Sequence, residues 1–228
     1  MSSLARLNMI VEGQTEETFV RELLQEPLAY RGVYVQVRCV ETRRRRSRVY
    51  RGGITSYAKA QGDMRRWLSE DKTAYLTTMF DLYKLPADFP GFEQAKNLSD
   101  PYQKVAYLED RLVADLADPR FIPYVQLHEF EGLLFSDVQA IDTILKVHHS
   151  RSQLTTLQRI RAQFKTPEAI DDGATTSASK RLQHLYTSYD KVLFGLRIAQ
   201  RIGLDTLRQE CPHFHNWVSK LEALSEAR

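Results

Sequence analysis

Val11-Glu12-Gly13-Gln14-Thr15-Glu16-Glu17 is the stretch that decides the fold of this chain. A short apolar run, residues 7–11, leads into it, and apolar residues at helical spacing follow it: Phe19, Val20, Leu23 and Leu24. We therefore expect a first strand that ends here, a tight turn at Gly13, and a first helix that begins with Thr15 as its N-cap and ends near residue 30.

Two glutamates of this stretch lie where open α/β sheets bind ligands. Glu12 follows the strand directly, and Glu16 comes four residues later, in the first turn of the helix. Ligands of such sheets bind just outside the carboxyl ends of the strands. A simpler alternative is that acidic residues here only complement the positive end of the helix dipole. That alternative accounts for Glu16 but not for Glu12.

Length and composition describe an ordinary globular protein. The chain has 228 residues, 43% hydrophobic and 27% charged, which fits one large domain or one domain with an appendage. No apolar run approaches the roughly 18 residues that a membrane span needs, and the first residues lack a signal-peptide pattern. The two cysteines, Cys39 and Cys211, are far apart and make no disulfide framework. We therefore expect a cytoplasmic protein without a membrane partner.

Positive charge is concentrated in one segment, although the net charge of the chain is only +3. Arginines crowd the residues from 38 to 51, where Glu41 is the single acid. Such a run is either a solvated loop or a nucleic-acid contact, and the guanidinium group matches phosphate oxygens bidentately. We expect a loop, closed by Gly52-Gly53, that binds nucleic-acid phosphates. The candidate residues are Arg43, Arg44, Arg45, Arg46, Arg48 and Arg51, with Lys180 and Arg181 from a later helix.

Strands and helices alternate through the first part of the chain. The pattern predicts further strands at residues 33–40, 74–80 and 121–127, and helices at residues 56–70 and 102–118. In the second of these helices the residues expected to point inward are Val105, Leu108, Leu112, Val113 and Leu116.

This alternation predicts an α/β fold with a mostly parallel sheet of about four strands flanked by helices. After Ser136 the pattern becomes helical. We therefore expect an α/β domain at residues 1–136 and a helical part at residues 137–228 packed on it.

Acidic residues follow three of the expected strands. Glu12 follows the first, Asp81 ends the third, and His128, Glu129 and Glu131 come directly after the fourth. Parallel strands bring their carboxyl ends to one edge, so we expect these side chains to converge there. Converging carboxylates repel one another unless a cation lies among them. Oxygen ligands without matching Cys or His spacing favour Mg²⁺ or Mn²⁺ over zinc, and such a cation beside an arginine-rich segment suggests phosphoryl chemistry.

The same motifs resemble known proteins. Glu12-Gly13 after a strand, Glu16 four residues on and Asp81 at a strand end resemble the Toprim fold of topoisomerases, primases and the overcoming-lysogenization-defect nucleases. The chain resembles domain-of-unknown-function family 4276 over nearly its whole length, through residues 11–16 and through Phe80-Asp81-Leu82-Tyr83, His128-Glu129-Phe130-Glu131, Ser179-Lys180-Arg181-Leu182 and Cys211-Pro212-His213-Phe214. This resemblance implies a Toprim-like fold and a place in bacterial anti-phage or mobile-element loci, with an ATPase partner encoded nearby.

Tyr83 departs from the Toprim pattern, because it stands where that pattern has the second acid of Asp-x-Asp. One or two metals are therefore both open, and Glu129 or Glu131 could supply the missing carboxylate. We expect a Mg²⁺- or Mn²⁺-dependent nuclease acting on DNA or RNA. The expected catalytic residues are Glu12, Asp81 and His128, and the expected metal ligands are Glu12, Glu16, Asp81, Glu129 and Glu131.

Two alternatives to a nuclease remain open. The first is a catalytically inactive Toprim-like subunit that docks an ATPase or nucleic acid, which the tyrosine at position 83 favours. The second is nucleotidyl transfer of the primase kind, for which no partner motif is visible in the sequence.

Overall fold

The computed structural model describes residues 4–45, 48–51, 54–148, 151–171, 173 and 175–226. The chain forms two compact units, one made of residues 1–125 and 217–228 and the other of residues 126–216. In sequence, the second unit is therefore an insertion within the first. The expected division into an α/β domain at residues 1–136 and a helical part at residues 137–228 packed on it stays a prediction.

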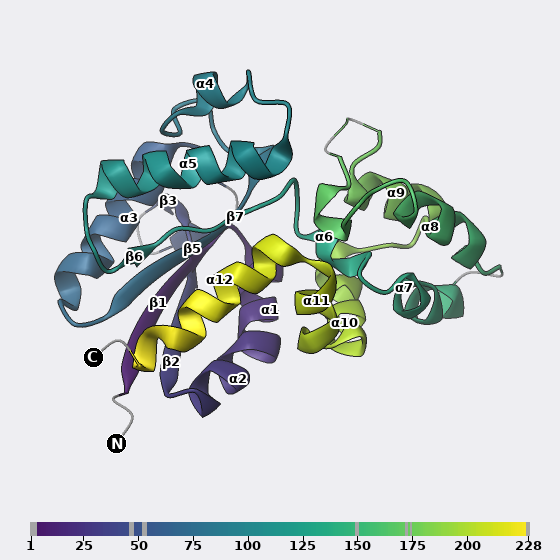
Figure 1. Cartoon of the computed structure of the whole chain (residues 1–228), viewed down its shortest axis with the longest axis horizontal. Helices are drawn as coiled ribbons and strands as arrows, with labels where there is room; N and C mark the ends of the chain where they lie inside the picture. The colour runs from purple at the N-terminus through teal and green to yellow at the C-terminus, as the bar shows by residue number, and fades with distance from the viewer. Residues whose placement is uncertain are drawn as a thin grey trace. The chain divides into compact units, whose positions relative to one another are not determined.

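A mostly parallel sheet forms the centre of the first unit (Figure 1). Its strand order is β2-β1-β5-β6, and β7 also pairs with β5. The pairs β1–β2, β1–β5 and β5–β6 are all parallel. The bounds are β1 Ala5–Val11, β2 Val33–Cys39, β5 Tyr75–Asp81, β6 Phe121–Ile122 and β7 Val125–Gln126. The predicted α/β architecture, a mostly parallel sheet flanked by helices, is confirmed.

The helices of the first unit lie on both faces of this sheet. The step from β1 to β2 and the step from β2 to β5 run in opposite directions across it, so right-handed connections place their helices on opposite faces. Figure 1 shows α3 and α5 on one side and α1 and α2 on the other. The bounds are α1 Gln14–Phe19, the π-helical η1 Val20–Leu24, α2 Gln25–Tyr30, α3 Tyr57–Glu70, η2 Leu82–Lys84, α4 Phe92–Ala95 and α5 Pro101–Leu116.

Three local predictions in this unit are wrong. The first helix begins at Gln14 with Gly13 as its N-cap, and Thr15 is buried inside the first turn. Val113 is 41% exposed, because it lies beside the stripe that buries the other four expected residues of α5. The strand expected at residues 121–127 is two short strands separated by Pro123, which has no N–H to donate.

The arginine-rich segment also differs from the expectation of a loop. It forms a two-stranded antiparallel ribbon, β3 Glu41–Arg45 with β4 Arg48–Arg51, whose register shifts between Glu41 and Arg43. Arg46 and the expected Gly52-Gly53 closure lie outside the described residues. A ribbon holds its residues in an extended, alternating arrangement that a loop does not impose.

Residues near the C-terminus complete the first unit. Helix α12, Pro212–Glu222, begins in the second unit, and its residues from Trp217 onward belong to the first, as does the short η5 Ala223–Ser225. The indole of Trp217 stacks on Tyr124 at 4.2 Å between ring centroids, and its Nε1 donates to Thr77 Oγ1 at 2.9 Å. Helix α12 is thus tied, through Trp217, to the middle of β5.

The second unit is helical. Its elements are α6 Glu131–Leu134, α7 Val138–Leu145, η3 Lys146–His148, α8 Leu154–Arg161, η4 Pro167–Ala169, α9 Ala178–Leu185, α10 Lys191–Ile202, α11 Leu204–Glu210 and the start of α12. The fully buried Glu168 accepts hydrogen bonds from the backbone N–H groups of His213 and Phe214, at 3.0 and 2.8 Å, and so caps α12. Across the described residues, the helices are too short or too polar to span a lipid bilayer.

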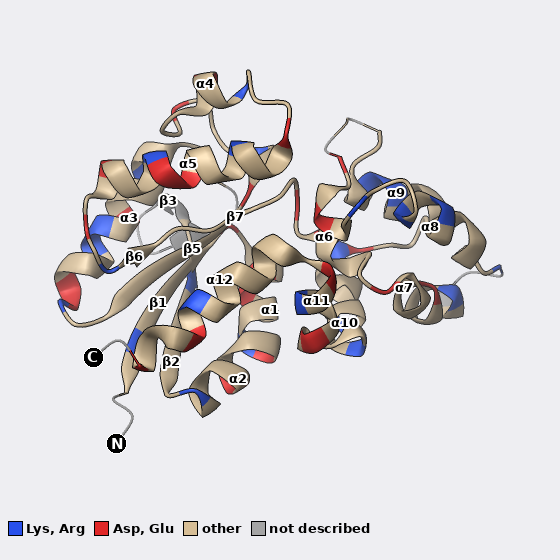
Figure 2. Ribbon diagram, viewed as in Figure 1, with Lys and Arg blue, Asp and Glu red and all other residues tan. Residues whose placement is uncertain are grey.

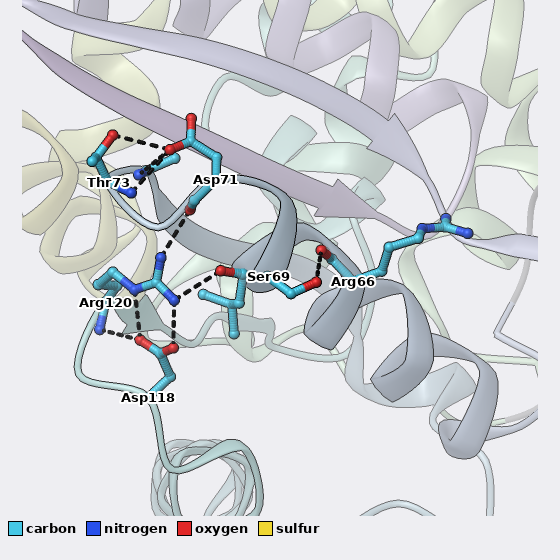
Figure 3. Close-up of polar contacts among 8 residues, drawn as sticks. Arg66, Ser69, Asp71, Thr73, Asp118 and Arg120 are labelled. Carbon is cyan, nitrogen blue, oxygen red and sulfur yellow. Dashed lines mark hydrogen bonds and ion pairs between the residues drawn. The ribbon is translucent and has the colours of Figure 1, made fainter.

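A polar network fixes the edge of the sheet in the first unit where β5 begins (Figure 3). The Arg120 guanidinium donates to both Asp118 oxygens, at 2.9 and 2.6 Å, and to the backbone oxygens of Leu68 and Asp71, at 3.0 and 2.8 Å. The C-terminal end of α3 is thereby tied to the residues that lead into β6. Hydrogen bonds and charge from Arg120 hold the pKa of Asp118 below its ordinary value, against the raising effect of desolvation.

We expect Asp118→Asn to lower the free energy of unfolding at neutral pH by about 1 kcal/mol, because it removes the charged acceptor. The folded-state pKa of Asp118 lies below its unfolded-state value, so this stabilisation is present above about pH 3.8 and is lost as the pH falls through the lowered pKa. Denaturant titrations of wild type and variant should therefore diverge near neutrality and converge in acid. The exposed Asp110 supplies the control, Asp110→Asn. Equal stabilities of wild type and Asp118→Asn near neutrality would contradict the assignment.

Candidate functional site

The candidate site lies at the carboxyl ends of β1 and β5, in the first unit. Between these neighbouring strands the order of the chain reverses, since β1 leads to β2 on one side and β5 leads to β6 on the other. Such a switch point leaves a crevice outside the strand ends, where open α/β sheets bind ligands. Glu12 follows β1, and Asp81 is the last residue of β5.

Both carboxylates are buried beside each other. Glu12 is 3% exposed and Asp81 is 1% exposed. The Glu12 backbone N–H donates to the Met79 oxygen at 3.3 Å, which continues the pairing of β1 with β5 past the strand end. The Asp81 N–H in turn donates to Glu12 Oε2 at 3.4 Å. Two backbone groups of β5 therefore hold Glu12, one at its backbone N–H and one at its carboxylate.

Lys84 joins the two carboxylates. Its Nζ lies 3.0 Å from Glu12 Oε1 and 3.8 Å from Asp81 Oδ2. The sum of these distances, 6.8 Å, is the upper limit for the separation of the two oxygen atoms. The sequence predicted that Glu12 and Asp81 would converge but did not single out Lys84. Lys84 follows Asp81 by three residues, a spacing at which two side chains on a helical turn can contact each other. That spacing could have identified Lys84 as a partner of Asp81.

Glu16 is held close to the backbone at Gly13. It is buried in the first turn of α1, and a Cβ atom at position 13 would lie 3.2 Å from its Oε2. That spacing is tighter than ordinary van der Waals contact, so the glycine leaves room for the carboxylate. Gly13 itself has an extended backbone, with φ of −153°, so it is the missing side chain and not the conformation that matters here.

Tyr83 does not join the buried acids. Its side chain is 48% exposed, between the buried Leu82 and Lys84 on η2. A tyrosine at this position also supplies no carboxylate oxygen. The position of the second Toprim acid therefore adds no negative charge to the pair of Glu12 and Asp81.

His128, Glu129 and Glu131 belong to the second unit, where the two glutamates have hydrogen-bond and ion-pair partners. Glu129 accepts hydrogen bonds from the backbone N and the Oγ of Ser179, at 2.5 and 2.9 Å, and so anchors the start of α9. Glu131 is buried and forms an ion pair with Lys191 at 3.2 Å. His128 has a left-handed backbone, with φ of 55°, which is uncommon for a residue other than glycine.

A buried tyrosine lies near these acids. Burial raises the pKa of the Tyr189 phenol well above its ordinary value, and the negative charge of Glu131 raises it further. Tyr189 is therefore a neutral hydroxyl at physiological pH. No sequence pattern marks this residue, because its environment is set by α6 and the start of α10, which are distant in the chain.

The expected nucleic-acid contacts are only partly described. The backbones of Arg43, Arg44, Arg45, Arg48 and Arg51 form the ribbon β3–β4, and their side chains lie outside the described atoms. Lys180 is exposed on α9 and contacts Gln183 at 3.3 Å. Arg181 pairs with Asp171 at 3.6 Å, donates to the Thr176 oxygen and lies over the Phe164 ring. Both residues lie on α9, which carries basic positions and no aspartate or glutamate, as the blue bands of that helix in Figure 2 show.

The donor chemistry of the candidate site fits a hard divalent cation. Within the described part of the chain, no group of three or more Asp, Glu, His or Cys side chains is arranged to hold a metal ion. Glu12 and Asp81 nevertheless provide two carboxylates at one place. Mg²⁺ commonly takes one or two carboxylates from a protein, and its other ligands are water and substrate phosphate. Oxygen atoms on opposite sides of Mg²⁺ are about 4 Å apart, which lies within the upper limit for the separation of these two carboxylate oxygens.

Comparison with known proteins identifies a family and a distant structural likeness. A family model described as "Domain of unknown function (DUF4276)" matches residues 11–222. No curated protein matches the chain.

Two solved structures that resemble the chain are C-terminal regions of OLD proteins. The one from Xanthomonas campestris pv. campestris is 17% identical, with 98% of this chain and 93% of that one covered and a TM-score of 0.47. The one from Burkholderia pseudomallei is 17% identical, with 97% and 99% covered and a TM-score of 0.46. At these values no functional residue can be transferred from either structure to this chain.

We expect Glu129→Gln to loosen the start of α9, because it removes the charge from the acceptor of both Ser179 hydrogen bonds. The free energy of unfolding should fall by about 1–2 kcal/mol, and the Ser179 amide should exchange its hydrogen faster than in wild type. Glu22→Gln, at an exposed position of η1, is the matched control. Unchanged exchange at Ser179, with loss of Mn²⁺ binding, would instead support the predicted role of Glu129 as a metal ligand.

Proposed function

The chain belongs to the family described as Domain of unknown function (DUF4276), and we propose that it hydrolyses phosphodiester bonds of nucleic acid with the help of one Mg²⁺ or Mn²⁺ ion held by Glu12 and Asp81. The observation that carries this proposal is the convergence of these two buried carboxylates on one positive charge at the switch point of the sheet. A cation at this place would supply Lewis-acid polarisation of a phosphoryl oxygen.

Each buried acidic residue of the candidate site in the first unit has its own role in the proposed reaction. In this proposal Asp81 and Glu12 are the ligands, and Glu12 also accepts a proton from the attacking water. Glu16 adds a third buried negative charge four residues along the chain, which increases the attraction for a cation. Tyr83 contributes no carboxylate, which favours one ion over two. The supporting roles predicted for His128, Glu129 and Glu131 stay predictions.

A second candidate function is a binding subunit that docks nucleic acid or an ATPase without cleavage. The contact of Lys84 with both acids favours it, since a permanent ion pair could satisfy the carboxylates without any metal. Partnership with an ATPase and a role in defence against phages, which the family resemblance implies, are parts of either proposal. Both functions predict nucleic-acid binding, and only the first predicts cleavage.

We expect the full chain to cleave plasmid DNA or RNA in the presence of Mg²⁺ or Mn²⁺, and Glu12→Gln and Asp81→Asn to lower the rate by at least about 100-fold. Each change removes a charge and keeps the shape of the side chain. Gel assays with both nucleic acids and both ions provide the measurement, and thermal melting checks that the variants fold. Glu22→Gln and Asp110→Asn, at exposed positions, are the controls.

The proposal is wrong if wild type and these variants show the same trace activity, or none, on every substrate. Binding without cleavage would then support the second candidate.

We also expect the ribbon β3–β4 to bind phosphates, because a two-stranded ribbon fits the major groove of duplex DNA and this one is rich in arginine. Replacing Arg43, Arg44, Arg45 and Arg46 by Ala should weaken the binding of all sequences alike. The slope of log affinity against log salt concentration should flatten by about 0.9 for each lost duplex contact. A fluorescence-anisotropy titration at several salt concentrations measures both quantities.

The matched control removes the same amount of charge from exposed positions elsewhere in the first unit: Arg31, Lys59, Lys72 and Lys96. An equal change of slope in both variants would show that only total charge matters and would remove the ribbon from the interface.

A further inference from the structure

Lys84 makes the contacts that a cation bound at the proposed site would make. Its Nζ is 3.0 Å from Glu12 Oε1 and 3.8 Å from Asp81 Oδ2. The two acids are nearly inaccessible, with side chains 4% and 0% exposed, whereas the lysine side chain is 44% exposed. A half-exposed ammonium group therefore neutralises two buried carboxylates from the solvent side.

The burial of the acids explains why a positive charge is needed. Two carboxylates that share a buried site repel each other and have lost the hydration that would stabilise them in water. In the protein without a bound metal, the ammonium group of Lys84 offsets part of both costs. A divalent ion between the same oxygen atoms would offset them too, and it would repel the ammonium group at that short distance.

The local structure allows the lysine to leave without a change of backbone. Leu82 and Leu85, on either side of the segment, are buried and anchor η2. The lysine stem has four rotatable bonds and one open side toward solvent. Only the side chain of Lys84 has to rotate for its nitrogen to move away from Glu12 and Asp81.

We propose that Lys84 is a built-in competitor for the divalent cation: it occupies the carboxylates of Glu12 and Asp81 in the metal-free protein and is displaced toward solvent when the ion binds. The inference rests on the metal site of the proposed function but not on catalysis. Lys84 thereby sets the affinity of the site for metal. Once displaced, its ammonium group lies at the mouth of the site, where an anionic phosphate group would approach.

Wild-type protein provides a direct test that needs no substitution. An acetylating reagent that attacks free amines should label Lys84 slowly without metal, because the amine is held in an ion pair. Addition of Mn²⁺ should raise the rate several-fold, as measured by mass spectrometry of the digested protein. Lys96 is the internal reference, because it also forms an ion pair three residues apart, with Glu93 at 2.7 Å. Sodium chloride at the same ionic strength controls for screening.

Variants supply the second test. Lys84→Met keeps the length of the side chain and removes its charge, so it should bind Mn²⁺ about tenfold or more tightly than wild type. The same variant should melt at a lower temperature without metal and gain more on addition of Mn²⁺. Lys84→Arg should stay near wild type, and Lys96→Met should change nothing. Titration calorimetry with Mn²⁺ alone gives the affinities, and Lys84→Gln replaces Lys84→Met if that variant does not fold.

The outcomes separate this inference from the proposed function. Equal or weaker Mn²⁺ binding by Lys84→Met, unchanged labelling of Lys84, or no Mn²⁺ binding by any form would overturn the competition. If Lys84→Met binds Mn²⁺ more tightly and the wild-type protein cleaves no nucleic acid, the competition is upheld and the proposed nuclease activity is rejected. Loss of Mn²⁺ binding in Glu12→Gln/Lys84→Met would confirm that both effects occur at the same carboxylates.

Discussion

Two negative charges buried at the ends of adjacent strands need a positive charge between them, and the first unit is built around this requirement. Glu12 and Asp81 are placed by the pairing of β1 with β5, which continues one residue past the end of β1. Both acids are buried at these strand ends. The segment after β5 therefore turns at once into η2, which returns Lys84 to the strand ends.

The same constraint explains the residues around the acids. β5 is buried from Leu76 to Asp81, as expected for a strand covered on both faces, so its end lies in a region of low dielectric. Gly13 lets the carboxylate of Glu16 lie against the turn. Charges in such a region interact strongly with one another and weakly with solvent. A positive charge between these acids, such as the ammonium group of Lys84, therefore stabilises the end of the sheet.

Much of the fold follows from patterns that the sequence displays directly. The period of apolar residues identifies α3 and the strands β1, β2 and β5, because their burial is set by the local alternation of the chain. Details that depend on a single backbone group do not follow from that pattern. Pro123 divides the last strand, and Gly13 caps α1 in place of Thr15. The arginine-rich segment has no apolar alternation at all, so its ribbon could not be recognised.

The candidate site also contains residues that the sequence predicts and residues that it does not. Glu12 and Asp81 could be predicted because strand ends meet at one edge of a parallel sheet whatever the side chains do. Lys84 could not, because a long flexible side chain can reach many partners and its choice depends on the folded neighbourhood. Glu129 and Glu131, which were expected as ligands, also have partners that the sequence did not indicate, Ser179 and Lys191, 50 and 60 residues away. Such pairings are properties of the folded chain alone.

The return of the chain to the first unit at Trp217 has a consequence for protein synthesis. The ribosome makes the sheet strands first and the whole inserted unit next, and only then the residues from 217 onward. Until then, the aromatic surface of Tyr124 and the hydroxyl of Thr77, both buried in the finished protein, lack the indole that covers them. The nascent chain thus carries an unfinished sheet for as long as translation of the insertion lasts. Exposed apolar surface of this kind makes a folding intermediate prone to aggregation.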